Sequence, residues 1–566
     1  MFSLSIEALA QALSTDILSL GLSTATFGIL SHVVVFRTLP VEEYLDNLLA
    51  LYVAATVAIG SAYLSITDVS FLQALFRVGV ITSAFNIGLA SSIGIYRLFF
   101  HRLHRFPGPT LSKVSRFYDA YLAGKSLQYN VEIEKMHETY EKYFELMGDP
   151  SGPREICIVR KSALPLLHSP QSQCSKSTFY AQSQTKSKYC NVNHTRDHDD
   201  HRRRRKAWDR GFSPKALATY EPSVGAKVDQ LISHLEKNLG QAIDISTWAM
   251  FLSFDIMGNV GFGKEFNNLA TGVEHPRIKA IHDHMAILGI LIHVPWLMNF
   301  AGRIPGAANE FAGFFKWCED EVVLKQKTWD VNEYPQDVVS WLLKAYVEKD
   351  VSAAPTPTAL HEDSRVVLVA GSDTTATTLA SIIYYLAKNP AVLSKLQRLL
   401  DEAMPGGSGE WSYEKAKSVT YLEDVINETL RLRPAVMEGG YRVTPPEGLQ
   451  VDEAYIPGDV NVFVPTQLIQ TDERYYEDAK AFVPERWHEK KEMVHEGAPF
   501  LPFLIGPYIC PGKNLALMSL RISVSRLVQL YDVKFAPGET GHAFETKTLD
   551  TFTTTLPPLQ IQFQRR

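Results

Sequence analysis

The sequence predicts a mainly α-helical protein with minor β-sheets, preceded by helices that are apolar enough to cross a membrane. Three observations support this prediction: a length of 566 residues with 46% hydrophobic residues, long helical stretches beyond residue 200, and three uncharged runs within the first 100 residues. This size and apolar content suffice for a large buried core and exclude a mainly disordered chain. The formal net charge of -6 argues against nucleic acid as a partner.

The first 105 residues are predicted to form a membrane anchor with two or three transmembrane helices. Uncharged runs cover Ile17–Phe36, Leu48–Thr67 and Val78–Tyr96, each close to the length of about 20 residues that spans a bilayer. The first run contains scattered Ser, Thr and Gly, which leaves the number of spans open. No Lys or Arg precedes Arg37, whereas basic residues cluster at 97–105. The positive-inside rule therefore predicts a lumenal N-terminus and a cytosolic main domain.

A short connection rich in Pro and Gly, Phe106-Pro107-Gly108-Pro109, leads from the anchor into the predicted main domain, residues 106–566. Periodicity and breaker residues predict helices at Pro222–Leu239, Thr247–Met257, Val322–Glu348, Ser364–Lys388 and Pro390–Ala403. Short strands are predicted around Arg154–Val159, Gly448–Tyr455, Val460–Val464 and Leu556–Phe563.

The most informative motif surrounds Cys510. Gly506 and Gly512 flank this cysteine, Phe503 leads into the loop, and Pro511 suits the first position of a helix. A helix N-terminus favours a thiolate over a thiol. An anionic sulfur on a Gly-containing loop is suited to be the axial ligand of a haem iron.

A cysteine at a loop-to-helix junction is also compatible with a purely structural, buried role. The other cysteines offer no Cys-x-x-Cys pair for zinc, and the odd total of five favours a reducing compartment over a disulfide framework. They are Cys157, Cys174, Cys190 and Cys318. The decision between the two roles of Cys510 depends on three motifs upstream.

These motifs follow one another along the chain. The first is Ala370-Gly-Ser-Asp-Thr-Thr375, the second Glu428-Thr-Leu-Arg431, and the third Phe482-Val-Pro-Glu-Arg-Trp487. The second lies on a predicted helix with Thr420 and Glu423 as a capping box. A Glu and an Arg three residues apart share one helix face, but alone they are a weak signal.

With Cys510, these motifs resemble the cytochrome P450 family of haem-thiolate monooxygenases, specifically its membrane-bound fungal type and its secondary-metabolism hydroxylases. The resemblance covers about residue 97 to the C-terminus. It implies the triangular prism fold of the family and haem b (iron protoporphyrin IX) bound to Cys510 as the axial iron ligand. It also implies a buried structural network of Glu428, Arg431 and Arg486.

The resemblance assigns the first motif to oxygen chemistry. A mid-helix Gly371 costs about 1 kcal/mol against Ala, and threonines can bond back to the preceding turn, so the residues alone also fit a kinked core helix. The family implies a widened helix groove where dioxygen binds over the iron. Thr374 and Asp373 are then the catalytic residues, because splitting the O–O bond takes two protons.

The remaining haem contacts are expected at its carboxylate groups. The basic stretch 194–206 could instead be a nucleic-acid patch or a histidine metal site, but interspersed acids and unsuitable spacing disfavour both. The resemblance places Arg205 and His201 on the propionates, with Arg442 as a further donor. Tyr508 departs from the family, which usually has a basic residue two positions before the cysteine. The region 143–153 also departs, so the first sheet is expected to start irregularly.

The function that the resemblance implies is the insertion of one oxygen atom from O2 into a lipophilic small molecule. Electrons come from NADPH through a separate reductase, with a cytochrome b-type donor as an additional partner, at the endoplasmic reticulum membrane. Substrate-lining segments are expected at 162–187, Val366, Val369, 436–441 and Phe552–Leu556. Two alternatives are a haem-thiolate isomerase or dehydratase that does not use O2, and a decayed haem-binding membrane protein.

Overall fold

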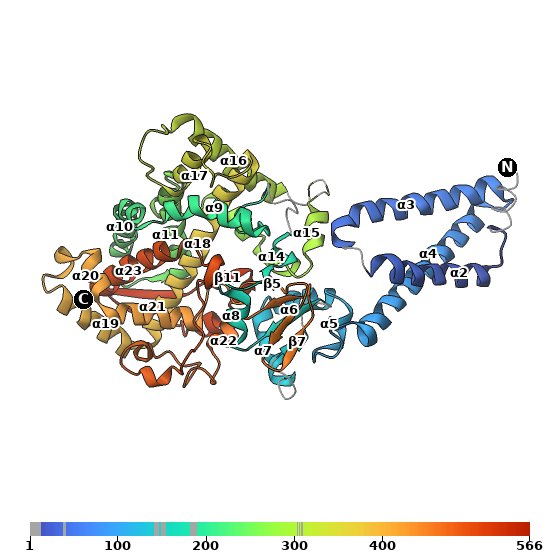
Figure 1. The fold of residues 1–566 in the computed structure, drawn as a ribbon. Coiled ribbons are helices and arrows are strands. Elements are labelled where there is room, and N and C mark those ends of the chain that lie inside the picture. The colour runs from blue at the N-terminus through green and yellow to red at the C-terminus, as the bar shows by residue number, and fades with distance from the viewer. Residues whose placement is uncertain are drawn as a thin grey trace. The chain divides into compact units, whose positions relative to one another are not determined.

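The computed structural model describes residues 13–37, 41–140, 146–148, 154–181, 189–302, 304, 306 and 309–566. The chain divides into two compact units, and the boundary falls after Arg116 (Figure 1). The irregular sheet start that the sequence predicts for 143–153 lies outside the described residues, except for the short strand at 146–148.

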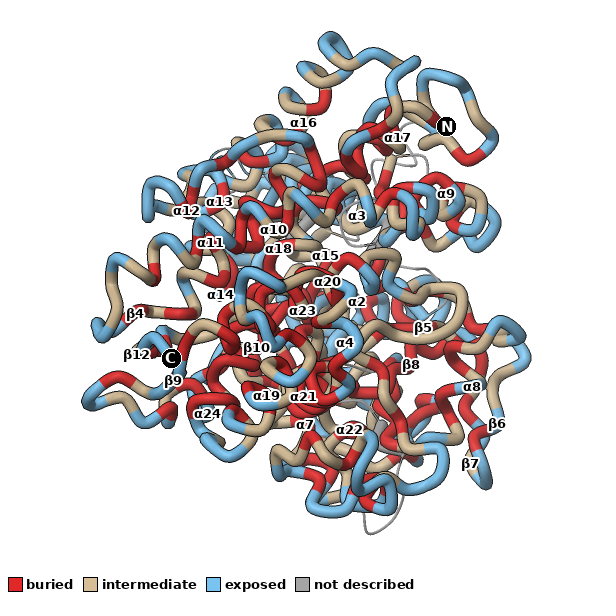
Figure 2. Tube along the Cα trace, turned by 90° about the vertical axis from the view of Figure 1, so that its left-hand side faces the viewer, coloured by how far each residue is buried: buried red, intermediate tan, exposed pale blue. Residues whose placement is uncertain are grey.

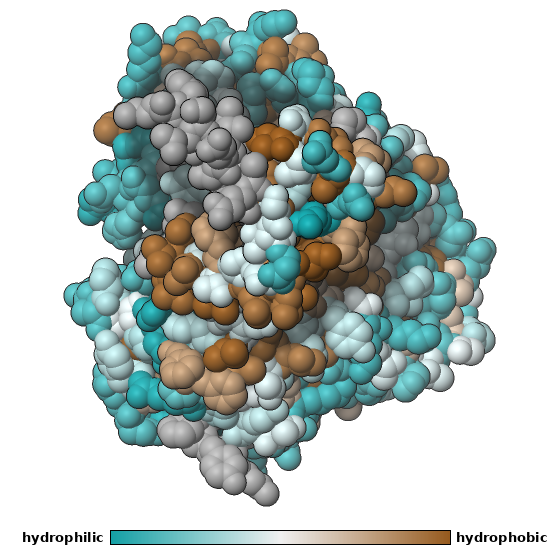
Figure 3. All heavy atoms as spheres, turned by 90° about the vertical axis from the view of Figure 1, so that its right-hand side faces the viewer, coloured by the Kyte–Doolittle hydropathy of each residue, from teal (hydrophilic) through white to brown (hydrophobic). Residues whose placement is uncertain are grey.

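Three long helices make up most of the first unit: α2 (Ile17–Ser31), α3 (Val41–Ile66) and α4 (Phe71–Ile95). Two π-helical turns extend α2 and α4, and one short helix follows them: η1 (His32–Phe36), η2 (Tyr96–Phe100) and α5 (Thr110–Val114). Three segments are long and apolar enough to cross a membrane: Ile17–Phe36, Tyr44–Ile66 and Phe71–Phe100. At most 11% of each apolar stretch is buried, and most of the large exposed apolar side chains of the structure belong to this unit. On the face shown in Figure 3, hydrophobic side chains (brown) gather over the middle, with hydrophilic ones (teal) around them.

Two glycines allow α2 and α4 to pack closely. A Cβ atom at Gly28 would clash with the carbonyl oxygen of Phe85, and one at Gly88 would clash with that of Ala25. Small residues at a crossing are typical of helices that associate in a membrane. His32 Nδ1 also lies 2.8 Å from the Ser92 hydroxyl across the same pair. The predicted anchor region is therefore a packed helical unit and not three separate apolar segments.

The second unit is mainly helical. Its helices before the central one are α6 (Phe117–Ser126), α7 (Tyr129–Tyr140), α8 (Ala163–His168), α9 (His198–Gly211), α10 (Pro214–Lys237), α11 (Ile245–Met257), α12 (Asn268–Thr271), α13 (Pro276–His282), α14 (Met285–Leu291), α15 (Pro295–Ala301), α16 (Asn309–Thr328) and α17 (Val338–Val347). The central and following helices are α18 (Pro357–Lys388), α19 (Pro390–Ala403), α20 (Tyr413–Ser418), α21 (Thr420–Leu432), α22 (Thr466–Gln470), α23 (Lys513–Leu530) and α24 (His542–Thr546).

The strands of the second unit are short and form two small sheets and two hairpins. The five-stranded sheet has the order β1-β2-β8-β5-β3, with β1 (Leu146–Gly148), β2 (Glu155–Ile158), β8 (Asn461–Phe463), β5 (Arg442–Val443) and β3 (Ser175–Lys176). The three-stranded sheet contains β4 (Ala242–Asp244), β12 (Gln560–Arg565) and β9 (Tyr531–Phe535). The hairpins are β6 (Leu449–Val451) with β7 (Ala454–Ile456), and β10 (Leu549–Thr551) with β11 (Thr553–Thr555).

The core of the second unit surrounds α18. About 67% of the apolar stretch of this helix is buried, so it is a core helix although its length and composition alone would allow a membrane span. It packs on α11, α21 and α23, and Ile382, Ile383 and Leu386 are completely buried. Figure 2 shows buried segments, in red, gathered around the labels of α18, α21 and α23. Each such side chain contributes about 1.5–3 kcal/mol of burial free energy. The mainly α prediction with minor sheets is confirmed.

The helix predictions differ from the structure mainly at their starts. α10 begins at Pro214 and not at Pro222, because Ser213 caps it: its hydroxyl accepts a hydrogen bond from the Ala216 N–H. α18 begins at Pro357, and Thr356 caps it in the same way. The single helix predicted for 322–348 is two helices, α16 and α17, and Asp337 caps the second. The strand predicted for 448–455 is the β6–β7 hairpin.

Candidate active site

Cys510 lies on a tight loop directly before α23. Its N–H donates to the carbonyl oxygen of Phe503 at 2.9 Å, which closes the loop. Gly506 has φ +72°, and a Cβ atom there would clash with the carbonyl oxygen of His168, so only glycine fits. α23 begins at Lys513 with Gly512 as its N-cap, so the expectation that Pro511 is the first helical residue was wrong.

Cys510 is the only one of the five described cysteines with exposed surface; the other four are buried. Burial within the protein raises the pKa of the Cys510 thiol, while the backbone N–H groups of Gly512 and Lys513 and the charge of Arg205 lower it. The N–H groups at the start of the helix lower the pKa of the Cys510 thiol, as the sequence predicted. Burial has the larger effect on this pKa and raises it. Metal coordination deprotonates a cysteine, so this thiol suits a metal ligand better than a free nucleophile.

The structure brings Glu428, Arg431 and Arg486 together in a completely buried cluster. Arg431 binds both oxygens of the Glu428 carboxylate, with Nε at 2.9 Å and Nη2 at 2.8 Å. Arg486 Nε donates to Glu428 Oε1 at 2.9 Å. The exposed fraction of all three side chains is 0%.

The two arginines of this cluster also fasten the irregular segment after α22. Arg431 donates to the carbonyl oxygens of Gln470 and Ala479 at 2.8 and 2.6 Å, and Arg486 donates to that of Glu477 at 2.7 Å. Val483 N–H and Trp487 Nε1 donate to the same carboxylate. One buried anion, the Glu428 carboxylate, therefore holds together α21 and the segment 470–487, which includes η7 (Pro484–Trp487).

The predicted capping box of α21 was wrong, since Val419 is its N-cap and makes no side-chain hydrogen bond to the helix.

α18 carries Thr374 on an accessible face. Val366, Val369, Ala370 and Thr374 all have accessible surface on this otherwise buried helix, and their spacing places them on one side. The Thr374 hydroxyl donates to the carbonyl oxygen of Ala370 at 2.8 Å. Gly371 faces the other way, because a Cβ atom there would lie 2.6 Å from the Met257 sulfur on α11.

Asp373 points to α13 and not to Thr374. Its Oδ1 lies 3.3 Å from His282 Nε2, and His282 Nδ1 is hydrogen-bonded to Glu274. Burial alone would lower the pKa of His282, but hydrogen bonds to Asp373 and Glu274 outweigh it and raise this pKa to about 10. The result is a polar chain, Glu274–His282–Asp373, that begins at a side chain with 23% exposure and ends on the central helix.

Asp373 and His282 also line a cavity of about 270 Å³ between α11, α13, α18 and the β11 region, and Met285, Thr377 and Leu556 contribute to its wall. The sequence did not indicate His282 or Glu274, because the contact joins residues 91 positions apart and follows no motif spacing.

The basic residues predicted to bind haem carboxylates gather around Tyr508. The His201 ring lies 4.7 Å from the Tyr508 ring, and the Arg442 guanidinium lies 4.6 Å from the same ring. Arg205 donates to the carbonyl oxygen of Ile509 at 2.6 Å. Burial, followed by nearby Lys176 and Arg205, lowers the pKa of His201 to about 2, so this ring is a neutral hydrogen-bonding group.

The residues around Tyr508 fit a dianionic, planar group such as haem. Arg442 is completely buried, and its Nε and Nη2 have no hydrogen-bond partner within the described part of the chain. A buried guanidinium with unused N–H groups is costly unless an anion accepts them. Phe503, Gly512 and Cys510 lie on the adjacent loop, and a sulfur with accessible surface is available as a ligand.

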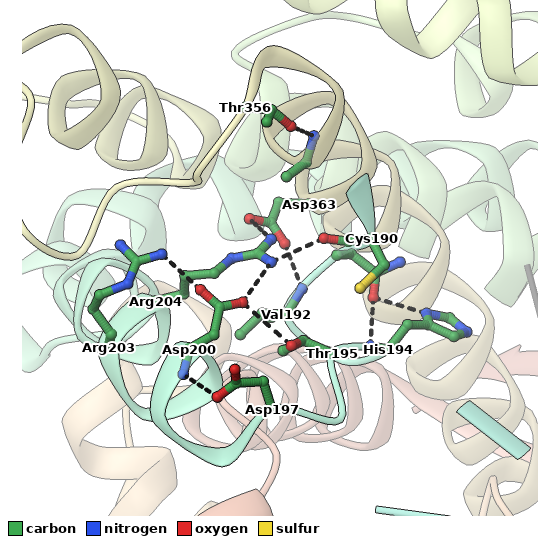
Figure 4. Close-up of polar contacts among 12 residues, drawn as sticks. Cys190, Val192, His194, Thr195, Asp197, Asp200, Arg203, Arg204, Thr356 and Asp363 are labelled. Carbon is green, nitrogen blue, oxygen red and sulfur yellow. Dashed lines mark hydrogen bonds and ion pairs between the residues drawn. The ribbon is translucent and has the colours of Figure 1, made fainter. Parts of the chain in front are cut away.

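A buried ion pair fixes α9, which carries His201 and Arg205, against α18 (Figure 4). Arg204 Nη2 donates to Asp363 Oδ2 on α18 at 2.7 Å, and the other Asp363 oxygen accepts the Val192 N–H at 2.7 Å. Arg204 Nη1 also donates to the Cys190 carbonyl oxygen at 2.9 Å. This pair could not be predicted from the sequence, because Arg204 is one of four consecutive arginines.

Three of the segments predicted to line the substrate site meet at Phe179. This ring stacks on Tyr441 with a centroid distance of 4.7 Å and on Phe552 at 6.0 Å. Phe552 has φ +80° at the turn of the β10–β11 hairpin, and 38% of its surface is exposed. Part of the segment 162–187 lies outside the described residues.

Comparison with known proteins agrees with this geometry. The family model Cytochrome P450 matches residues 117–563. Cytochrome P450 monooxygenase FCK2 of Fusarium pseudograminearum is 36% identical over 95% of this chain and 96% of its own length. Cytochrome P450 monooxygenase orf5 of Eupenicillium brefeldianum is 38% identical over 85% of this chain and 95% of its own length. Tryprostatin B 6-hydroxylase of Aspergillus fumigatus is 32% identical over 82% of this chain and 81% of its own length.

A crystal structure of a cytochrome P450, CYP102L1, superimposes with a TM-score of 0.64 at 21% sequence identity, covering 78% of this chain and 94% of that one. This similarity shows the fold that the sequence motifs led us to expect. The matches extend over nearly all of the second unit and include the cysteine loop, the buried ion network and the central helix. The chain therefore belongs to the cytochrome P450 family and is a cytochrome P450 monooxygenase.

Proposed function

We propose that this monooxygenase inserts one oxygen atom from O2 into a lipophilic small organic molecule, with NADPH electrons delivered by a separate reductase. The observation that carries the proposal is the arrangement of Cys510, the Arg442 and Arg205 cations and the accessible Thr374 face within one unit. A cytochrome b-type protein is a second candidate donor. The three apolar helices of the first unit support an endoplasmic reticulum anchor with the second unit in the cytosol.

In this proposal, Cys510 would hold haem b through its sulfur, and Arg205, Arg442 and His201 would hold the haem carboxylates. When bound, the haem supplies the reductive activation of dioxygen. Phe503, Gly506 and Gly512 shape the loop around the sulfur. Glu428, Arg431 and Arg486 keep the loop-bearing segment in place.

The chain's own contribution to the reaction is the delivery of protons. Thr374 Oγ1 donates to the Ala370 carbonyl oxygen on the accessible face of α18, so its oxygen can accept a bond from a water molecule or hold a proton donor in place. Asp373 is one residue away and can receive protons from His282, which in turn contacts the partly exposed Glu274. This acid–hydroxyl pair supports oxygen chemistry over the isomerase or dehydratase alternative.

Replacing Thr374 with alanine should uncouple electron use from product formation. We expect Thr374→Ala to keep the haem spectrum and NADPH consumption, while hydrogen peroxide formed per NADPH rises about tenfold, because one proton-delivery group is lost. Thr378→Ala is the matched control, since Thr378 is buried one turn further along α18 and its hydroxyl makes the same kind of bond, to the Thr374 carbonyl oxygen. Equal peroxide yields from the two variants would contradict the assignment.

His282 should make stability depend on pH. Its pKa is raised from 6.5 to about 10 in the folded protein, so its ion pairs contribute fully below about pH 6.5, and this contribution is lost as the pH rises through about 10. We expect His282→Gln to lower the free energy of unfolding by about 2 kcal/mol at pH 6 and by much less at pH 10.5. Thermal unfolding of the detergent-solubilised chain at the two pH values measures this. A loss that is equal at both pH values would argue against a charged His282.

The substrate class follows from the lining. Phe552 and Val369 offer aromatic and aliphatic surface, and the buried rings of Phe179 and Tyr441 stack next to Phe552, which favours a lipophilic ligand with rings. The similarity to a tryprostatin B hydroxylase supports a fungal secondary metabolite. The test is to incubate the purified chain with a reductase and candidate metabolites, and to measure substrate-dependent NADPH and O2 consumption. Turnover without O2 consumption would favour the isomerase.

A further inference from the structure

A second buried cation, Lys176, lies beside the residues that we assign to the haem carboxylates. It belongs to β3, and its relative exposure is 2%. Its Nζ donates to the carbonyl oxygens of Val192 at 3.1 Å and Asn193 at 2.7 Å. A lysine ammonium has three donors, so one N–H of Lys176 remains for another acceptor.

The strand register places this cation opposite another one. β3 pairs antiparallel with β5, and Lys176 is the direct partner of Arg442. Like charges directly opposite each other destabilise a sheet, and here both side chains are buried. Within the described residues, neither of them has a carboxylate at ion-pair distance, and two donor nitrogens of Arg442 have no partner. Two buried side chains of this kind can both stay charged only with an anion between or beside them.

Tyr508 connects this pair to the cysteine loop. Lys176 Nζ lies 4.8 Å from the centre of the Tyr508 ring, and the Arg442 guanidinium lies 4.6 Å from it. The ring face attracts both cations but carries no charge that would neutralise them. Tyr508 stands two residues before Cys510, where the family usually has a basic residue, so the loop itself supplies one cation fewer than expected.

Burial, then the charge of Arg442, lowers the pKa of Lys176 well below its usual range. A carboxylate placed near both groups would reverse this effect, because an opposite charge favours the protonated form. The chemistry of the cluster thus matches a propionate and not a neutral ligand.

We propose that Lys176 binds a haem propionate and replaces the positive charge that Tyr508 does not provide. This inference rests on the haem site proposed above. The competing explanation is that Lys176 only fastens the segment 192–193 through its two carbonyl contacts. The two explanations differ in what they require, because fastening needs a hydrogen-bond donor and propionate binding needs a charge.

Substitutions at position 176 separate the two roles. Lys176→Gln keeps a donor without the charge, and Lys176→Arg keeps the charge. We expect Lys176→Gln to release haem to apomyoglobin about tenfold faster than the wild type, since a charge-assisted hydrogen bond is lost. Its reduction potential should become more negative, because a cation near the haem is removed. Lys176→Arg should behave like the wild type in both measurements.

A second-site change tests the compensation directly. Adding Tyr508→Arg to Lys176→Gln should restore slow haem release and the higher potential. Lys227→Met is the matched control: this buried lysine on α10 already has a carboxylate partner, Glu265, so its loss should lower stability without changing haem release from the folded protein. Circular dichroism of each variant verifies the fold.

Two results would overturn the inference while leaving Cys510 as the haem ligand. The first is a Lys176→Gln variant with the haem-release rate and reduction potential of the wild type. The second is a faster haem release in Lys176→Gln that Tyr508→Arg does not slow. A wild-type chain that binds no haem through a thiolate would overturn the proposed site and this inference together, and the spectrum of the wild type alone identifies that case.

Discussion

Cys510→Ala should abolish thiolate-bound haem. The loop around Cys510 is held by the Phe503 carbonyl bond and by Gly506, neither of which needs the sulfur, so the variant should still fold. We expect little or no haem to be retained, and any haem that binds should lack the long-wavelength Soret band of the reduced carbon monoxide complex. Monooxygenase activity should be lost entirely.

Cys318→Ala is the matched control for this substitution. Cys318 is a buried cysteine on α16, and burial raises the pKa of its thiol to about 12. Its removal should cost modest stability and leave the spectrum unchanged. A long-wavelength band that persists in Cys510→Ala would contradict the assignment of the ligand.

Glu428→Ala should be the most destabilising substitution in the chain. It would leave Arg431 and Arg486 buried without their shared anion, and removing one partner of a buried ion pair costs about 3–5 kcal/mol. We expect most of the protein to lose folded, haem-binding structure. Haem content per chain and thermal unfolding measure the loss.

Glu423→Ala on the same helix is the control. Glu423 pairs with Arg521 at 2.8 Å, but 30% of its side chain is exposed, so its removal should cost about 1 kcal/mol or less. If the two alanine variants proved equally stable, the buried network would not have the structural role that we give it.

The sequence was most informative where a local motif carries the chemistry. The cysteine loop, Glu428 with Arg431, and the apolar runs of the first unit are visible as short patterns, and α19 has the predicted bounds Pro390–Ala403. The starts of α10 and α18 were missed although Ser213-Pro214 and Thr356-Pro357 are cap signals, because the apolar periodicity becomes evident only further along.

Contacts between distant segments that no family motif marks were not predictable. His282 meets Asp373 across 91 positions, and Arg204 meets Asp363 across 159, and no spacing rule links either pair. Lys176 opposite Arg442 depends on the register of two very short strands, which the alternation of side chains cannot fix. The positions of His282, Arg204 and Lys176 relative to the site therefore became visible only in the packed structure of the second unit.

The most direct test of the central claim is the reduced carbon monoxide difference spectrum of the purified full-length chain. The assignment of Cys510 predicts a long-wavelength Soret band that disappears in Cys510→Ala and persists in Cys318→Ala. A colourless wild-type protein, or a short-wavelength band typical of haem without a thiolate, would contradict it.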